Sequence, residues 1–482
     1  MTEIIEMGMG ELTRAMSSGQ ISAEEAARAH LQQIEKQNSN LHAFLSITAE
    51  QALATAKKVD SLRAKKAPLM PLAGVPMAIK DNICTKGVKT TCASKMLQDF
   101  VPAYNATVMD KLAEQRAVML GKLNMDEFAM GSSNENSAFM PVKNPVDPAR
   151  VPGGSSGGAA AAVAARCAMF TLGSDTGGSI RQPAAFCGVV GMKPTYGRVS
   201  RYGLVAFASS LDQIGPLARN VEDCAIVLNA ICGQDASDST SAPRPVPDFT
   251  AGLRGGVKGA KIALPEELLG EGTAPEVRQT VLAAAKRYRE LGAQVDVISM
   301  PSLKSALPAY YVISSAEASS NLARFDGIRY GTRAANFESV EDLYLQTRSQ
   351  GFGAEVKRRI MLGTFTLSAG YYDAYYQKAM QVRTVIAEEF KQVFEKYQLI
   401  LSPVAPTTAW RFGEKSNPME MYLSDICTVP VNIAGLPALS MPGGRDSDGM
   451  PIGVQLIGNA FDEAGILRAA WALESTRREA GV

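Results

Sequence analysis

The segment Gly173-Ser-Asp-Thr-Gly-Gly-Ser-Ile-Arg181 is the most informative stretch of this sequence. It follows a short apolar run, and its Ser179 lies 24 residues after Ser155 in a second cluster, Gly153-Gly-Ser-Ser-Gly-Gly158. The second cluster opens an alanine-rich segment. Apolar, well-patterned sequence continues directly on both sides of it, which disfavours a flexible Gly/Ser linker at that point. The two clusters therefore belong to an ordered core, one opening an expected helix and the other following an expected strand.

Short apolar runs bounded by glycine alternate with longer helical stretches around these clusters. This β-α-β order predicts an α/β fold with a largely parallel sheet. We expect a large mixed, mainly parallel central sheet covered by helices on both faces, with a helical N-terminal segment. The expected strands are Val75–Ile79, Val118–Leu120, Ala168–Leu172, Val189–Met192, Ile262–Leu264, Gln294–Ile298 and segments near Leu399, Ala438 and Ile452. The expected helices are Thr107–Arg116, Ser156–Cys167, Val221–Ile231, Ala274–Leu291 and one from about Asp462.

The domain organisation follows from the absence of any internal repeat, heptad pattern or low-complexity tail. We expect one large domain over residues 1–482. Within it, residues 1–65 form a helical collar that includes a capping-box pattern, Ser22-Ala-Glu-Glu25. Residues 71–235 form the core with the two clusters, and residues 236–482 supply the remaining strands and helices.

The composition excludes several classes of chemistry. The chain has 482 residues, of which 46% are hydrophobic and 20% charged, and its formal net charge is +1. A basic surface that neutralises nucleic-acid phosphates is therefore not expected overall. Only two histidines are present, His30 and His42, both near the N-terminus. A Ser-His-Asp triad elsewhere in the chain and a histidine-rich metal site are thereby nearly excluded.

The cysteines and the apolar segments indicate the compartment. Seven cysteines are scattered without a Cys-x-x-Cys pair, so neither a disulfide framework nor a structural zinc site is expected. The N-terminal residues lack the basic and apolar regions of a signal peptide. The longest apolar stretch, Ala159–Ala165, is too short to cross a bilayer. We expect a soluble protein of the reducing cytoplasm, without contact with a membrane.

A serine nucleophile in this chain needs a base other than histidine. A serine hydroxyl reacts only when a neighbouring group takes its proton, and a neutral lysine does so in known Ser-Lys enzymes. Lys80 directly follows the apolar segment Gly74–Ile79, so its amine would lie at the end of a strand. Burial there would lower its pKa towards neutrality. Gly177 and Gly178 allow a sharp turn that directs main-chain N–H groups towards a developing oxyanion.

Two other interpretations of the clusters are weaker. Glycine loops at helix N-termini bind phosphate, but this chain has no Gly-x-x-x-x-Gly-Lys-Ser/Thr motif. The tripeptide Asp175-Thr-Gly177 also matches that of aspartic proteases. Their chemistry needs two carboxylates that share a proton, and the chain has no second Asp-Thr/Ser-Gly. Serine catalysis with a lysine base remains.

Lys80 and the two serine clusters together resemble the amidase signature family, including the 24-residue spacing between the serines. The resemblance implies that Ser179 is the acyl-forming nucleophile, that Ser155 relays its proton from a cis peptide, and that Lys80 is the terminal base. It also implies that the oxyanion hole consists of main-chain N–H groups, those of Thr176, Gly177, Gly178 and Ser179. It implies no metal or cofactor bound by this chain.

Further segments resemble one branch of that family, the glutamine-hydrolysing subunits of bacterial tRNA-dependent amidotransferases. These segments are Asn124–Asn136, Ala318–Gly331, Gly351–Phe365 and Tyr422–Pro442. The resemblance implies a heterotrimer in which this chain hydrolyses glutamine and sends ammonia to a tRNA-binding partner. That partner, a kinase and transamidase, would use ATP and Mg²⁺ to convert Glu-tRNA(Gln) and/or Asp-tRNA(Asn) to the amidated forms. A third, small linking protein would join the two.

Recognition of glutamine follows from its two charged groups. An arginine fork suits the α-carboxylate, and a carboxylate suits the α-ammonium. By the resemblance, Arg359 and Asp425 take these roles and Tyr310 lines the pocket. Arg358 is adjacent and equally basic, so the sequence alone does not separate the two arginines. A free-standing amidase that acts on other small amides is the alternative, while the intact serine–lysine pattern disfavours a non-catalytic scaffold.

Overall fold

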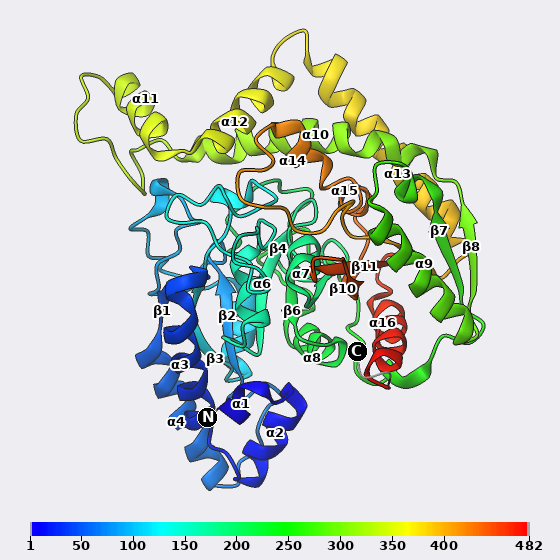
Figure 1. Ribbon diagram of the computed structural model, residues 1–482. Helices are drawn as coiled ribbons and strands as arrows, with labels where there is room; N and C mark the ends of the chain where they lie inside the picture. Colours follow the sequence, from blue (N-terminus) through cyan, green and yellow to red (C-terminus); the bar gives the residue numbers. More distant parts are fainter. Residues whose placement is uncertain (1, 480–482) are drawn as a thin grey trace.

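The computed structural model describes residues 2–479, and a single sheet of eleven strands runs through them (Figure 1). The order of the strands across the sheet is β1-β3-β2-β4-β6-β5-β10-β11-β9-β7-β8. In the same order their bounds are Phe44–Ile47, Val118–Leu123, Pro76–Lys80, Phe170–Asp175, Gln213–Ala218, Val190–Lys193, Ala438–Arg445, Pro451–Gly458, Leu399–Pro403, Lys261–Pro265 and Gln294–Ile298. Every expected strand is present, and β1 and β6 are two strands that the sequence pattern did not indicate.

The directions of the strands correct one expectation. Within the described residues, four neighbouring pairs are parallel, β3-β2, β2-β4, β9-β7 and β7-β8, and the other six are antiparallel. The mixed sheet with flanking helices is confirmed, but the parallel pairs are not the majority. Apolar runs report burial and not direction, so the pattern did not reveal the antiparallel centre, which contains the unpredicted strand β6 and the hairpin β10–β11.

Helices flank the sheet as expected. In chain order α1–α8 are Thr2–Glu6, Met9–Ser18, Ala23–Leu41, Ala49–Ala64, Thr107–Glu114, Gly157–Ala164, Arg181–Cys187 and Val221–Ile231. The helices α9–α16 are Pro275–Glu290, Ala306–Asn321, Val340–Gly351, Ala354–Leu367, Lys378–Phe394, Pro418–Leu423, Val429–Ile433 and Glu463–Glu479. The capping box predicted at Ser22 and Glu25 begins α3, with both of its hydrogen bonds formed. The N-terminal helices α3 and α4 pack against β2 and β3.

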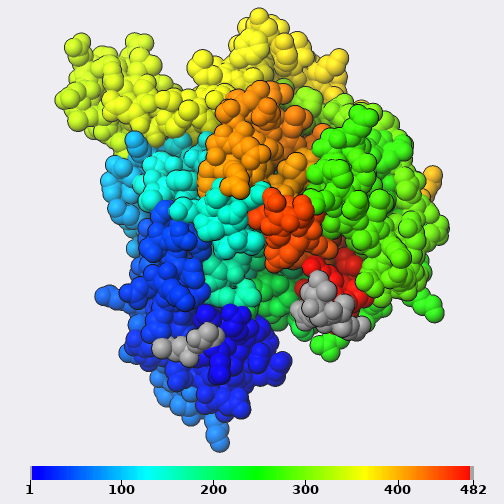
Figure 2. Space-filling view, viewed as in Figure 1, coloured from blue at the N-terminus to red at the C-terminus, as the bar shows by residue number. Residues whose placement is uncertain are grey.

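The arrangement of these layers defines one functional edge of the sheet. Strands β2 and β4 are parallel neighbours, so their carboxyl ends, Lys80 and Asp175, lie at the same edge. Helices α10 and α12 pack on each other and cross the molecule above this edge (Figure 1). The chain around α12 forms the upper rim of the surface in Figure 2, drawn in yellow. Parallel strands place functional groups at their carboxyl ends in many α/β proteins.

Two further findings concern the cysteines and the membrane. All seven cysteines are buried and free. Among residues 2–479, no helix is both long and apolar enough to span a bilayer.

Candidate active site

The Lys80 side chain lies at the centre of a buried cluster of serines. It ends strand β2, where its side chain is fully buried. The Lys80 Nζ atom lies 2.7 Å from Ser155 Oγ, 2.9 Å from Ser156 Oγ and 2.9 Å from Ser174 Oγ. Asn82 Nδ2 donates to Ser174 Oγ at 2.9 Å and so holds that hydroxyl beside the lysine. The predicted contact between Lys80 and Ser155 is therefore formed.

The surroundings of Lys80 make its amine a base near neutral pH. Burial lowers the pKa of Lys80 to about 7, while the carboxylates of Asp126, Asp175 and Asp212 act in the opposite direction. Desolvation disfavours the charged form of an amine, and nearby negative charges favour it. A base whose pKa lies near the working pH is well matched to proton transfer. The amine is thus able to accept a proton from Ser155.

The Ser155 loop is fixed by close packing. The Gly154–Ser155 peptide bond is cis, as the resemblance implies. A Cβ atom on Gly154 would lie 2.0 Å from Asp126 Oδ2, so only glycine fits at that position. The Asp126 N–H donates to Ser155 O at 3.3 Å, and the Ser156 N–H donates to Ser179 O at 3.0 Å. The last of these bonds brings the two serine clusters together.

The turn before Ser179 contains the expected oxyanion donors, and one of them is already in use. Gly178 has a φ of +136°, and its N–H donates to Asp175 Oδ1 at 2.9 Å. Within residues 2–479 the N–H groups of Thr176, Gly177 and Ser179 form no hydrogen bond. The structure therefore differs from the expectation at Gly178, because the turn directs its N–H to the Asp175 carboxylate. The other three donors are free for a ligand.

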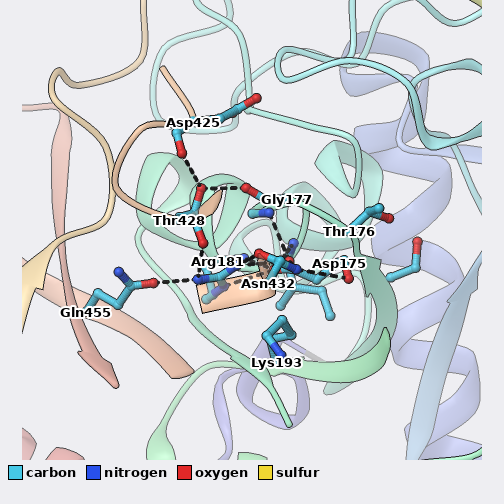
Figure 3. A network of polar contacts seen from close by, with 12 residues as sticks. Asp175, Thr176, Gly177, Arg181, Lys193, Asp425, Thr428, Asn432 and Gln455 are labelled. Atoms are coloured by element: carbon cyan, nitrogen blue, oxygen red, sulfur yellow. Dashed lines mark hydrogen bonds and ion pairs between the residues drawn. The ribbon is translucent and has the colours of Figure 1, made fainter. Parts of the chain in front are cut away.

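The Asp175 carboxylate and the Arg181 guanidinium hold this turn from beneath (Figure 3). Arg181 is fully buried and donates to both carboxylate oxygens of Asp175, at 3.0 and 3.1 Å. Burial alone would raise the pKa of Asp175, but the charge and hydrogen bonds of Arg181, together with Lys193 and Asn432, outweigh that effect and keep the pKa well below its usual range. Arg181 also donates to Thr428 O and Gln455 Oε1. This network joins the nucleophile turn to the C-terminal part of the chain.

The three predicted glutamine-binding residues lie close to the same turn. Tyr310 belongs to α10, and a Cβ atom on Gly177 would lie 2.6 Å from its hydroxyl oxygen. Its neighbour Tyr311 donates from its hydroxyl to Asp425 Oδ2 at 3.0 Å. Burial raises the pKa of Asp425 to about 6, against hydrogen bonds from Ser132 and Tyr311 that lower it. Tyr310 and Asp425 are thus joined through α10, beside the turn that precedes Ser179.

The structure separates the two candidate arginines. The Arg359 side chain is 3% exposed and its guanidinium lies over the rings of Tyr311 and Tyr422, at 4.5 and 4.8 Å from their centroids. Its Nε atom donates to Glu355 Oε1 at 2.7 Å, whereas Nη1 has no hydrogen-bond partner among the described residues. The Arg358 side chain is 47% exposed and pairs with the other oxygen of Glu355. Arg359 is therefore the buried one of the two arginines and the one with an unpartnered donor group among the described residues.

Comparison with known proteins identifies the family to which this chain belongs. The family model described as amidase matches residues 25–467 of the chain. This chain belongs to the amidase family. The A subunit of the Glutamyl-tRNA(Gln) amidotransferase of Moorella thermoacetica is 60% identical to this amidase over 475 residues, which are 98% of this chain and 97% of the relative.

Solved structures share the fold of this amidase over almost its whole length. The crystal structure of the A subunit of Glutamyl-tRNA(Gln) amidotransferase from Thermotoga maritima is 43% identical, with a TM-score of 0.79 over 98% of this chain and 94% of that chain. The peptide amidase from Stenotrophomonas maltophilia is 30% identical, with a TM-score of 0.83 over 98% and 97% of the two chains. The fold thus accommodates different substrates, and sequence similarity favours the amidotransferase subunits.

Several polar residues around the site of this amidase were not predicted from its sequence. Ser174, Asn82 and Asp126 surround Lys80, Glu355 pairs with Arg359, and the Thr428 hydroxyl donates to Gly177 O at 2.6 Å. Ser174 carried a signal, because it lies inside the Ser179 cluster. Asp126, Glu355 and Thr428 lie in segments that resemble the amidotransferase subunits, but the resemblance assigned no role to them. Asn82 lies in an ordinary segment, where an isolated polar residue is usually exposed. Among the described residues, no group of three or more His, Cys, Asp or Glu could hold a metal ion.

Proposed function

We propose that this chain is the glutamine-hydrolysing subunit of a cytoplasmic tRNA-dependent amidotransferase. The observation that carries the chemistry is the contact between Lys80 and Ser155, in which a fully buried amine lies 2.7 Å from a serine hydroxyl. The similarity to amidotransferase A subunits over 98% of the chain supports the substrate. The two partners, a tRNA-binding subunit that uses ATP and Mg²⁺ and a small linking subunit, belong to this proposal.

Hydrolysis proceeds in two halves. Ser179 Oγ attacks the side-chain amide carbon of glutamine while its proton passes through Ser155 to Lys80. The carbonyl oxygen becomes an oxyanion that the free N–H groups of Thr176, Gly177 and Ser179 stabilise. The proton returns to the leaving nitrogen, the C–N bond breaks, and ammonia departs. Water then attacks the γ-glutamyl ester with the same base assisting, which releases glutamate and restores Ser179.

The charges of the pocket select glutamine among amides. Arg359 keeps an unpartnered Nη1 amino group that can bind the α-carboxylate, and the position of Arg359 is held by Glu355. Asp425 presents a carboxylate to the α-ammonium. A pocket with buried charged groups discriminates strongly against a ligand that leaves them unpaired. This pocket therefore favours glutamine over amides that lack the two charges.

Replacement of the nucleophile tests the division of labour between subunits. In the complex with its partners, misacylated tRNA and ATP, we expect Ser179→Ala to abolish amidation that uses glutamine and to preserve amidation that uses added ammonium. Ser440→Ala is a matched control, because Ser440 is a buried serine in β10 whose hydroxyl has no partner within residues 2–479. Loss of both reactions in Ser179→Ala would refute the proposal. Turnover of many amides without a preference for glutamine would indicate a free-standing amidase.

A further inference from the structure

The buried side-chain amide of Gln182 connects α7, the helix that follows Ser179, with the loop before Ser155 and the loop that contains Ser132. The mechanism above assigns no role to this connection. Gln182 lies three residues after Ser179, in the first turn of α7, and is fully buried. Its Oε1 atom accepts the Gly154 N–H at 2.9 Å, next to Ser155. Its Nε2 atom donates to Ser132 O at 2.9 Å. A single side chain thus contacts both the cis-serine loop and the loop that contains Ser132.

The Ser132 loop continues this connection to the proposed ammonium site. Ser132 is buried, and its hydroxyl donates to Asp425 Oδ2 at 2.7 Å. The same carboxylate oxygen accepts the Tyr311 hydroxyl. Asp425 is therefore connected to Gly154 through three hydrogen bonds between buried groups. The Ser132 hydroxyl contacts Asp425, the Ser132 carbonyl contacts Gln182, and Gln182 contacts the Gly154 N–H. Hydrogen bonds of this kind are strong and directional in a low-dielectric interior.

The amide of Gln182 suits this place for a specific reason. It must accept one main-chain bond and donate another, and a side-chain amide offers an acceptor and a donor on two separate atoms without a charge. The fit is close, since a Cβ atom on Gly153 would lie 2.7 Å from Gln182 Oε1. A carboxylate at this position would place an oxygen against Ser132 O. An apolar side chain would leave Gly154 N–H and Ser132 O unpaired and buried, which is costly.

We propose that Gln182 is a positioning residue that couples occupation of Asp425 by the substrate ammonium to the placement of the Ser155 loop. The inference rests on the proposed function, since it takes glutamine as the substrate. When the ammonium binds Asp425, the Ser132 hydroxyl is held in place, and Gln182 holds Gly154 and the adjacent Ser155 in the position that accepts the Ser179 proton. Glutamine thereby contributes to its own catalysis, and an amide without the ammonium does not.

The test compares two substrates in the assembled complex. Glutaramate keeps the amide and the carboxylate of glutamine but lacks its α-ammonium. We expect Gln182→Met to reduce kcat/KM for glutamine about tenfold or more, mainly through kcat, and that for glutaramate by less than about threefold. The preference for glutamine over glutaramate therefore falls. An equal loss for both substrates would show that Gln182 only supports the fold, and would overturn the proposal.

A matched control removes another buried amide from the same helix region. Asn144 is buried, and its Nδ2 atom donates to Phe186 O of α7 at 2.9 Å and to Val151 O at 3.1 Å. Asn144→Leu should lower the unfolding temperature as Gln182→Met does and leave the ratio of the two substrates unchanged. A comparable fall of that ratio in Asn144→Leu would contradict a specific path through Gln182.

A second variant interrupts the path without disturbing Gln182. Ser132→Ala removes the hydrogen bond to Asp425 and keeps the main-chain contact with Gln182, so it serves even where Gln182→Met does not fold. We expect it to reduce the glutamine preference as well, and the double variant to reduce it no further than the stronger single variant. Additive losses would mean two independent effects and would overturn the coupling. A wild-type complex with no preference for glutamine would instead refute the proposed function.

Discussion

The catalytic cluster (Lys80, Ser155 and Ser179) and the glutamine pocket (Tyr310, Arg359 and Asp425) are built in different ways. The cluster lies at the carboxyl ends of two neighbouring strands and in two glycine turns, all within about a hundred residues of the chain. The pocket draws on α10, α12 and the segment before α15. Main-chain geometry fixes the cluster, whereas stacked rings and buried ion pairs fix the pocket.

Each region contains a buried basic side chain, and the pKa values of the two side chains are shifted in opposite directions. Burial lowers the pKa of Lys80 to about 7, because no carboxylate approaches closely enough to outweigh it. Burial also acts to lower the pKa of Arg359, but Glu355 and three neighbouring tyrosines, Tyr310, Tyr311 and Tyr422, together outweigh it and raise that pKa. One cation can therefore give up its charge and act as a base, while the other keeps its charge and binds an anion. Substitutions should accordingly change kcat in the cluster and KM in the pocket.

Among the substitutions that compare the two cations, the largest effect is expected for Lys80→Met, which removes the base and keeps a similar volume. General-base catalysis contributes about 10²- to 10⁴-fold, so kcat for glutamine hydrolysis should fall within that range while KM changes little. Lys122→Met is a matched control. Lys122 is also a fully buried lysine at the edge of the sheet, but it pairs with Asp81 at 3.3 Å and lies outside the serine cluster.

Steady-state kinetics and thermal unfolding of both lysine variants separate the two roles. Lys122→Met should lower stability because it leaves Asp81 unpaired in the interior, with a much smaller loss of kcat per folded molecule. A similar loss of kcat in both variants would contradict the assignment of Lys80 as the base and Lys122 as a structural lysine.

A smaller effect, on KM, is expected for Arg359→Lys. A lysine cannot both pair with Glu355 and present a planar donor to the substrate carboxylate. Loss of a charged hydrogen bond costs about 1.5–3 kcal/mol, so KM should rise about 10- to 100-fold with kcat nearly preserved. Arg358→Lys changes the exposed neighbour that shares Glu355, and should alter KM less than about twofold. A larger rise of KM in Arg358→Lys would reverse the assignment of the two arginines.

The same difference explains which features the sequence could reveal. The catalytic cluster was predictable because Lys80 ends an apolar segment and the serines stand in glycine-rich turns whose spacing is fixed by one helix and one strand. The residues that support the pocket were harder to find. Glu355 pairs with Arg359 four residues later on the same helix, a spacing that is also common on exposed helix faces. Tyr422 meets Arg359 only through the packing of α12 against a distant segment. Strand direction was missed for a related reason, since it depends on connections rather than on local pattern. The division into a single domain over residues 1–482 stays a prediction.

The smallest effect concerns the pH dependence of the catalytic cluster. Glutamine hydrolysis should rise with pH through about 7 and then level off, because Lys80 acts as a base only after it loses its proton. Asp126 is the first of the carboxylates that oppose this loss, and it also has its own pKa raised by burial to about 7. Asp126→Asn removes the negative charge and keeps one of the two side-chain oxygens, so it retains an acceptor for one of the main-chain N–H groups of Asn134 and Asn136, which donate to different oxygens.

The direction of change in the pH profile identifies the titrating group. If Lys80 controls the rise, Asp126→Asn makes the ammonium less stable, so the rise moves to lower pH and the rate below pH 7 increases, by less than about tenfold. If Asp126 itself were the controlling group, the rise would vanish in the variant. Profiles of kcat and kcat/KM between roughly pH 5 and pH 9 distinguish these outcomes, because this range extends about two pH units on each side of the Lys80 pKa. The direction of movement tests whether burial of the lysine, rather than ionisation of its neighbour, sets the working pH of the cluster.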